Sequence, residues 1–282
     1  MKNVKTKTPI LFAATVVCGL LFQFISCSPE TGLPTQDDVV RLPDDAQIEV
    51  FGKVRMQWAP TDFREIVYDA AKNPVRVRQE NLFVENSDIT RKVQYDFLYD
   101  ENQHLKQIRT DKFYINYSLE GDHVKETKEY ALDETLIRTR TYFYNGNKLS
   151  KLVQTDSPAN YETQFHFFYD ENSNLKEMRE YQKNNQTGYF DKYNAVRYSA
   201  YDDKKNVENL WMIYPYLPNV SFSNNNFGQI SFYHFDGKSV TETSARKFFS
   251  YQYDKNGYPV SRKETGSNGG ISLTAAYTYS GI

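Results

Sequence analysis

The sequence predicts an all-β fold, an extended antiparallel β-meander of hairpins that twists or curls into an open sheet or a partial barrel. The first observation is composition: 23 Tyr, 19 Phe and 2 Trp make 16% of the 282 residues aromatic, and aromatic residues favour strands over helices. The second is a repeated pattern, in which an alternating aromatic run ends at Asp or Asn and leads through polar residues to an aliphatic residue. Aromatic residues two apart share one strand face, so each copy predicts a hairpin.

The beginning of the chain is typical of an export signal. Three lysines precede an apolar stretch over 10–25, which ends in Phe24-Ile25-Ser26-Cys27. This ending resembles the bacterial lipobox, in which an invariant cysteine follows an apolar pair and a small residue. The resemblance implies that residues 1–26 are a lipoprotein signal peptide and that Cys27 is acylated as the mature N-terminus. The alternatives are an uncleaved anchor helix, or an ordinary secretory signal in which Cys27 is incidental.

Cysteine content and charge narrow the class of protein. The sequence has two cysteines, Cys18 within the signal and Cys27, so an exported mature chain has no thiol pair for a disulfide. The formal net charge is -2, which excludes a general electrostatic affinity for nucleic acid. The mean hydropathy of -0.71 excludes a polytopic helical membrane protein. We therefore expect a lipid anchor as the contact with the membrane, at the outer membrane or cell surface.

The remainder of the chain divides into a spacer and a domain. Residues 27–46 contain the lipidated cysteine, three prolines and five acids with few apolar residues, a composition that cannot bury enough surface to fold alone. We interpret this stretch as a flexible spacer. No further linker follows, so residues 47–282 are expected to form a single all-β repeat domain.

The hairpin pattern is clearest at Tyr95–Leu105 and Phe165–Leu175, with further copies at 197–207 and 249–260. The Asp after the last aromatic residue can accept a hydrogen bond from a backbone N–H two residues on and so close an Asx-turn. Sequence-adjacent strands should pair, because such short turns leave no room for crossovers. A set of small helices is the competing interpretation, which the period-2 aromatic runs disfavour. The predicted turn-forming carboxylates are Asp100, Asp170, Asp202 and Asp254.

The motif Tyr-x-Tyr-Asp-x-x-Gly at Tyr251–Gly257 resembles the YD (Rhs-type) repeats of bacterial exported proteins. Over nearly its whole length the chain resembles uncharacterised surface lipoproteins of Bacteroidetes-type bacteria, which combine a lipobox, an acidic spacer and irregular YD hairpins. The resemblance implies display at the cell surface. It does not name a ligand, because its motifs describe turns.

No motif for chemistry is found. The sequence contains no Gly-x-Ser-x-Gly elbow, phosphate loop or dinucleotide fingerprint, and its four histidines lack metal-ligand spacing. We therefore expect no catalytic residue, no metal and no cofactor, and a protein that is not an enzyme. Carboxylates are plentiful, which leaves a glycan hydrolase as a third hypothesis.

The longest departure from the hairpin rhythm is Leu210–Phe227, and loops on a rigid sheet commonly carry binding sites. It combines aromatic rings, which offer contact area at low entropic cost, with amide groups. The alternative is that these rings fold inward and plug one end of the sheet. The candidate binding residues are Trp211, Tyr214, Tyr216, Asn224 and Asn225, with Trp58 as a separate candidate.

These observations lead to two main hypotheses. The first is a non-enzymatic, membrane-anchored envelope lipoprotein that binds a glycan, a peptide or a partner protein. The second is a structural or assembly lipoprotein of an outer-membrane complex with no small ligand.

Overall fold

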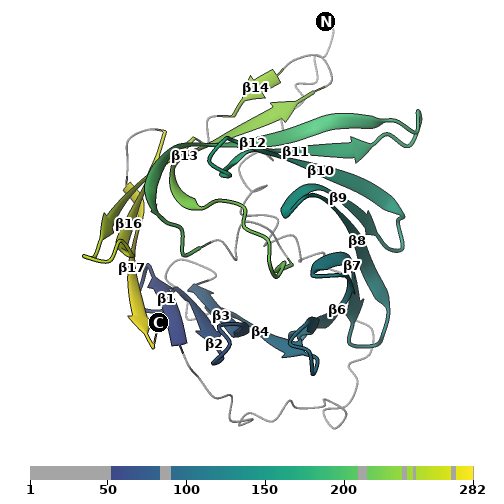
Figure 1. Ribbon diagram of the computed structural model, residues 1–282. Helices are drawn as coiled ribbons and strands as arrows, with labels where there is room; N and C mark the ends of the chain where they lie inside the picture. Colours follow the sequence, from purple (N-terminus) through teal and green to yellow (C-terminus); the bar gives the residue numbers. More distant parts are fainter. Residues whose placement is uncertain are drawn as a thin grey trace, which may run out of the picture.

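The computed structural model describes residues 52–82, 90–208, 215–236, 240–243, 246–267 and 271–281. Within these ranges the chain forms seventeen β-strands and no helix (Figure 1). The strands are β1 (Gly52–Gln57), β2 (Phe63–Tyr68), β3 (Pro74–Leu82), β4 (Thr90–Tyr99), β5 (Leu105–Arg109), β6 (Phe113–Glu120), β7 (His123–Ala131), β8 (Leu136–Asn145), β9 (Lys148–Asp156), β10 (Tyr161–Tyr169), β11 (Leu175–Lys183), β12 (Phe190–Lys205), β13 (Asn225–Phe235), β14 (Val240–Glu242), β15 (Lys247–Tyr253), β16 (Pro259–Gly266) and β17 (Ile271–Ser280).

The strands form one closed antiparallel barrel. Nearly every strand pairs with its successor along the chain, and β1 pairs with β17 to complete the ring (Figure 1). The short strand β14 and strand β15 both pair with β13, so they share one position and the barrel has sixteen positions. The predicted all-β antiparallel meander is confirmed, and the sheet closes completely.

Five-residue turns join several of the hairpins. After β10, the N–H of Asp170 donates to the carbonyl of Asn174 at 2.9 Å, and the Asp170 carboxylate accepts from the N–H of Asn174 at 2.8 Å. Each such turn needs a residue at positive φ in its fourth position, as Ser173 at 66° and Gly257 at 80° show. Asp100 and Asp254 lie in turns of the same kind, and each accepts two backbone N–H groups through Oδ1.

The turn predicted at Asp202-Asp203 is wrong, because β12 continues through both residues to Lys205. Strand β13 stays paired with this extension, through Lys205 and Asn225, so the chain has no reason to reverse earlier. The Asp202 carboxylate does accept the N–H of Lys204, two residues on, at 3.0 Å, but this bond does not reverse the chain. The carboxylate also accepts hydrogen bonds from the N–H of Asn226 at 3.1 Å and from the hydroxyl of Tyr253, and thereby ties three strands together.

The two faces of the wall differ in chemistry. Phe165 and Phe167 of β10 face inward and are buried, whereas the alternate residues Gln164 and His166 face outward. The interior core is aliphatic and aromatic, and its larger cluster contains Val124, Tyr142, Leu149, Leu152, Phe165, Phe167, Leu175, Met178, Val196, Tyr198 and Ile230. The outward face carries cross-strand ion pairs, which include Lys53–Glu65, Arg76–Asp96, Arg179–Glu177 and Arg197–Glu177.

A barrel of about sixteen strands encloses a lumen too wide for its own side chains to fill. The connection between β12 and β13 enters this lumen (Figure 1). At its start, the Glu208 carboxylate accepts from Arg262 Nη1 at 2.7 Å and from the Tyr277 hydroxyl, both on the inner wall. Towards its end, Leu217 and Phe222 are buried in the larger core cluster. We call the described part of this connection, 206–208 and 215–224, the inner segment.

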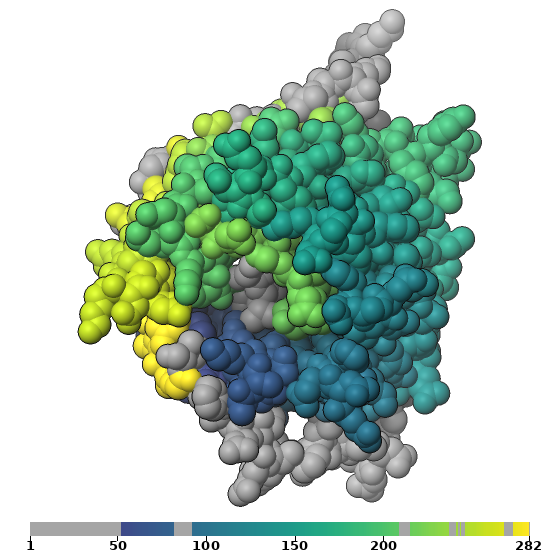
Figure 2. Space-filling model, viewed as in Figure 1, coloured from purple at the N-terminus to yellow at the C-terminus, as the bar shows by residue number. Residues whose placement is uncertain are grey.

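The inner segment lies at the end of the barrel that carries the five-residue turns at Asp100, Asp170 and Asp254, which we call the Asp turns. Its Asn219 and Asn224 side chains donate to the carbonyls of Asp122 and Asn172, which belong to turns at that end. In Figure 2 the green part of this segment spans one side of the barrel mouth. The chain itself therefore occupies part of the lumen at this end.

Candidate functional site

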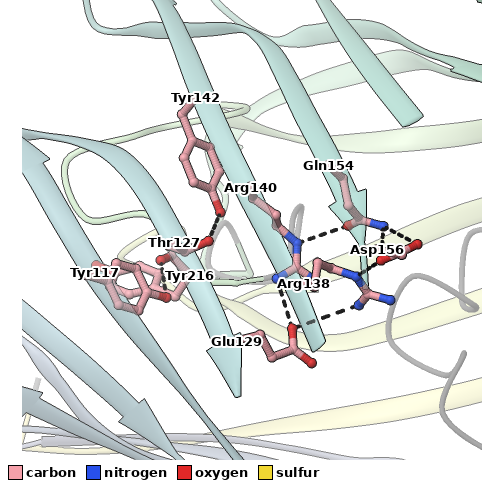
Figure 3. A network of polar contacts seen from close by, with 9 residues as sticks. All are labelled: Tyr117, Thr127, Glu129, Arg138, Arg140, Tyr142, Gln154, Asp156 and Tyr216. Carbon is pink, nitrogen blue, oxygen red and sulfur yellow. Dashed lines mark hydrogen bonds and ion pairs between the residues drawn. The ribbon is translucent and has the colours of Figure 1, made fainter. Parts of the chain in front are cut away.

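Charged and amide side chains gather on the inner wall at β7, β8 and β9 (Figure 3). The cross-strand register brings Glu129, Arg138 and Asp156 into one row. Arg140 and Gln154 stand beside each other in the next row. Because all five residues occupy inward positions, the barrel wall alone brings together groups that lie up to 27 positions apart in the sequence.

These side chains hold one another in fixed orientations. Glu129 Oε2 accepts from Arg140 Nη1 at 2.9 Å and lies 3.8 Å from Arg138 Nη1. Arg140 Nε also donates to Gln154 Oε1 at 3.0 Å, and Arg138 Nε donates to Asp156. Hydrogen bonds between charged partners are the strongest in proteins, so this cluster presents its remaining donors and acceptors in a preorganised arrangement.

Exposure to water increases along the cluster. Glu129 is wholly buried, whereas the side chain of Asp156 is 30% exposed. Asp156 ends β9 at the end of the barrel opposite the Asp turns. The cluster therefore lies near that end of the barrel, and Asp156 is its carboxylate exposed to water.

Glu129 leaves one carboxylate oxygen without a partner. Two guanidinium groups lie near Oε2, but no described residue donates to Oε1. An unsatisfied buried acceptor costs free energy, and native proteins generally supply a partner from protein or water. Oε1 is therefore a buried acceptor to which no described residue donates.

Further polar groups continue the inner wall from β11 to β13. The two oxygens of Glu180 accept from Gln182 Nε2 at 2.9 Å and from Asn194 Nδ2 at 2.8 Å. Asn194 Oδ1 lies 3.0 Å from Nδ1 of His234, which faces it across β12 and β13. This second cluster also lies at the end away from the Asp turns, because His234 is one residue from the end of β13.

Two tyrosines stand among these polar groups. Tyr161 pairs with Asp156 across β9 and β10. Burial raises the pKa of Tyr161, and the charges of Glu180 and Asp156 raise it further, which reflects the proximity of both carboxylates. Tyr193 is the extra residue of a β-bulge, a feature that redirects side chains. Its ring is partly exposed and contacts the edge of His234, with the ring centroids 5.1 Å apart.

We call this constellation the lumen site: Glu129, Arg138, Arg140, Gln154, Asp156, Tyr161, Glu180, Tyr193, Asn194 and His234. It offers carboxylates, guanidinium groups, amides and rings. Among the described residues no group of three or more His, Cys, Asp or Glu side chains is arranged to hold a metal ion. The described ranges also contain no helix long and apolar enough to cross a membrane.

The candidate binding residues predicted from the sequence are not part of the lumen site. The ring of Tyr216 packs against Phe97, with centroids 5.6 Å apart, and burial raises its pKa to about 12. Trp58 packs against a small core cluster that contains Met56 and Tyr277. For the described part of Leu210–Phe227, the structure thus shows the inward-folded arrangement. Cys27, Trp211 and Tyr214 lie outside the described residues.

Asn224 and Asn225 lie where the inner segment meets β13, and both make hydrogen bonds within the chain. Asn225 N donates to Asn174 Oδ1 at 3.1 Å, and its side chain donates to the carbonyl of Lys204. Asn224 is exposed, and its side chain donates to the carbonyl of Asn172. The amides nominated as ligand contacts thus make contacts within the chain.

Sequence reasoning missed the lumen site. Its charged residues look like ordinary outward residues of a half-buried strand. One signal in the sequence could have revealed the site. Arg138, Arg140 and Tyr142, a core residue, follow one another at intervals of two, so they lie on the same inward face of β8. Charged residues on the core-facing side of a strand are unusual and would have indicated this site.

The comparisons with known proteins agree on the fold. No protein-family model matches the sequence, and neither does any curated protein. Among solved structures, a porin-like protein from Bacteroides uniformis is similar, with a TM-score of 0.55 and 13% identity over 83% of this chain and 96% of that chain. A porin-like protein from Bacteroides vulgatus has a TM-score of 0.51 and 11% identity over 83% of this chain and 99% of that chain. At these identities the likeness establishes the barrel fold.

Proposed function

We propose that this protein is a non-enzymatic cell-envelope lipoprotein that is anchored through Cys27 and binds a glycan at the lumen site. The lipobox-like ending at Cys27 supports the anchor. The similarity to barrels described as porin-like proteins of Bacteroides supports a place at the outer membrane or cell surface. We propose no catalytic activity for this protein.

The chemistry of the outward face favours attachment to the membrane through a lipid anchor rather than insertion of the barrel wall into the bilayer. A barrel that spans a bilayer needs an outward apolar band about 25 Å tall. Here the outward face carries ion pairs on many strands, such as Arg76–Asp96 at 2.6 Å and Arg179–Glu177 at 2.7 Å. Charged groups are costly in hydrocarbon, so this wall suits water.

The observation that carries the ligand assignment is the lumen site itself. A sugar presents hydroxyl groups, each both donor and acceptor, around a ring with apolar C–H faces. The lumen site presents a matching set, with the partly exposed carboxylate of Asp156, the amide of Asn194 and the partly exposed ring of Tyr193. Its groups are oriented by their mutual hydrogen bonds, which lowers the entropy cost of binding.

A glycan array probed with the detergent-solubilised full-length protein tests this proposal. We expect retention of at least one neutral oligosaccharide, and loss of that retention in Tyr193→Ala and in Asn194→Ala. Tyr189→Ala is the matched control, because Tyr189 is 77% exposed at the tip of the β11–β12 hairpin and is outside the lumen site. No retention of any glycan, or equal loss in the control, would contradict the proposal. Reproducible cross-links to an envelope protein in native membranes without glycan retention would favour the assembly lipoprotein.

A further inference from the structure

The outer wall over β8–β13 carries cations and aromatic rings in two adjacent rows. The cross-strand register places Phe143, Lys151, His166, Arg179, Ala195 and Tyr233 side by side over six strands. No carboxylate interrupts this row. The second row contains Phe168, Glu177, Arg197 and Ser231. We call these ten residues the outer strip.

Each cation of the outer strip lies over a ring. Lys151 Nζ is 4.1 Å from the ring centroid of Phe143, and Arg179 Cζ is 4.3 Å from that of Phe168. Arg197 Cζ is 4.4 Å from the ring centroid of Tyr233. The attraction between cation and ring holds both groups close to the sheet. Phe143 is nevertheless 42% exposed and Phe168 37% exposed, so both rings remain available to a partner.

The outer strip is positive on a chain whose formal charge is -2. Its three permanent cations face one carboxylate, Glu177, which is shared between Arg179 at 2.7 Å and Arg197 at 3.4 Å. Burial lowers the pKa of His166, and the charges of Lys151 and Arg179 lower it further, as expected within a positive field. A concentrated positive patch on an acidic protein attracts anionic partners.

A chemically matched motif occurs on the opposite side of the barrel. Arg55 lies over the ring of Phe63 at 3.7 Å, and Arg55 and Lys53 share Glu65. There the ring of Phe63 is only 6% exposed. The motif can therefore stabilise a sheet without offering an aromatic surface. The outer strip differs in keeping its rings exposed.

We propose that the outer strip binds an anionic polysaccharide. Acidic groups of the polymer pair with Lys151, Arg179 and Arg197, and the C–H faces of its sugars lie on Phe143 and Phe168. Five inter-strand spacings separate the ends of the first row, a span of about 24 Å, which suits a polymer rather than a single small anion. This site is separate from the lumen site and does not depend on it.

Binding to dextran sulfate, with neutral dextran as the paired probe, tests this proposal. We expect the detergent-solubilised protein to bind dextran sulfate and not dextran, with affinity falling as salt screens the charges. The Lys151→Gln/Arg197→Gln variant should lose at least tenfold in affinity. Phe143→Ser/Phe168→Ser should also bind more weakly, although its charge is unchanged. The matched control, Lys53→Gln/Arg55→Gln, should bind as the unmodified protein does.

Thermal melting of every variant separates lost binding from lost folding, and only variants that melt cooperatively are compared. Equal affinity of the Lys151→Gln/Arg197→Gln variant, or equal loss in the control, would overturn the proposal. Binding to phosphatidylglycerol vesicles without binding to dextran sulfate would overturn it in favour of a lipid surface. Tyr193→Ala, which changes the lumen site, should leave dextran sulfate binding intact.

Discussion

Asp170 shows how one carboxylate sets a hairpin. It accepts the N–H of Asn174 at 2.8 Å and closes the turn between β10 and β11. We expect Asp170→Ala to lower the free energy of unfolding by about 1 kcal/mol, the typical net value of one hydrogen bond. Urea denaturation measures this, with Asp203→Ala as the control because the Asp203 side chain is exposed and lies 2.9 Å from Lys204 Nζ in a surface ion pair. An equal effect of both substitutions would contradict a specific role for the turn carboxylate.

His166 gives stability a dependence on pH. Burial and then the charges of Lys151 and Arg179 lower its pKa in the folded protein below the usual value of about 6.5. Between the lowered pKa and 6.5 the unfolded chain binds more protons, so stability should fall as pH decreases through this window. We expect His166→Gln to reduce the loss of unfolding free energy between pH 7.5 and 5.5. Identical pH profiles of the two proteins would show that His166 is not the group responsible.

At the residue scale, the sequence predicts where the chain turns but not which distant residues a side chain contacts. Asp100, Asp170 and Asp254 are followed by residues that tolerate a reversal, and local chemistry suffices to predict it. Asp202 likewise follows a tyrosine at the end of an aromatic run, but β13 pairs past it and its carboxylate bonds to Tyr253, 51 positions away. A long-range contact overrides the local preference there, and no short motif encodes that contact.

At the scale of elements, the inner segment is the clearest departure from the hairpin rhythm. We expect Phe222→Ala to lower the free energy of unfolding by about 3–5 kcal/mol, because it empties a ring-sized volume in the larger core cluster. Asn224→Ala is the control, since Asn224 is exposed, and should change the value by less than about 1 kcal/mol. Thermal and urea unfolding measure both. A near-neutral Phe222→Ala would mean that the inner segment detaches easily from the lumen.

The sequence identified this segment as unusual but did not predict whether it folds into the lumen or forms an exposed surface. Irregular spacing between hairpins marked Leu210–Phe227 as unusual. Aromatic rings and amides suit both a binding surface and a packed interior, so composition left both alternatives open. The answer depends on the width of the lumen, which is a property of the whole sheet.

At the scale of the whole molecule, closure of the barrel creates the lumen site. The sequence predicted antiparallel hairpins, and these follow from local patterns. The pairing of β1 with β17 joins residues more than 200 positions apart, and no local signal specifies it. The lumen site cannot be predicted from local sequence for the same reason, because Glu129 and His234 face one interior only when the barrel is closed.

The outward face also makes the anchor testable. A wall that carries ion pairs on many strands should not hold the protein in a bilayer without lipid. We therefore expect full-length Cys27→Ser to move from the membrane fraction to the soluble fraction, measured by fractionation and immunoblotting. Mass spectrometry of the unmodified protein should show loss of residues 1–26 and a lipid mass on Cys27. A Cys27→Ser protein that stays in the membrane fraction would contradict the lipid anchor.

Hydrogen–deuterium exchange in the presence of a neutral oligosaccharide retained on the array shows where the ligand binds. We expect it at the lumen site, at the end of the barrel opposite the Asp turns. We predict that the glycan slows amide exchange at 154–163 and 190–196, which border Asp156, Tyr161 and Tyr193. Protection confined to the turns at 100–104 and 170–174, or no protection by any retained glycan, would contradict this account.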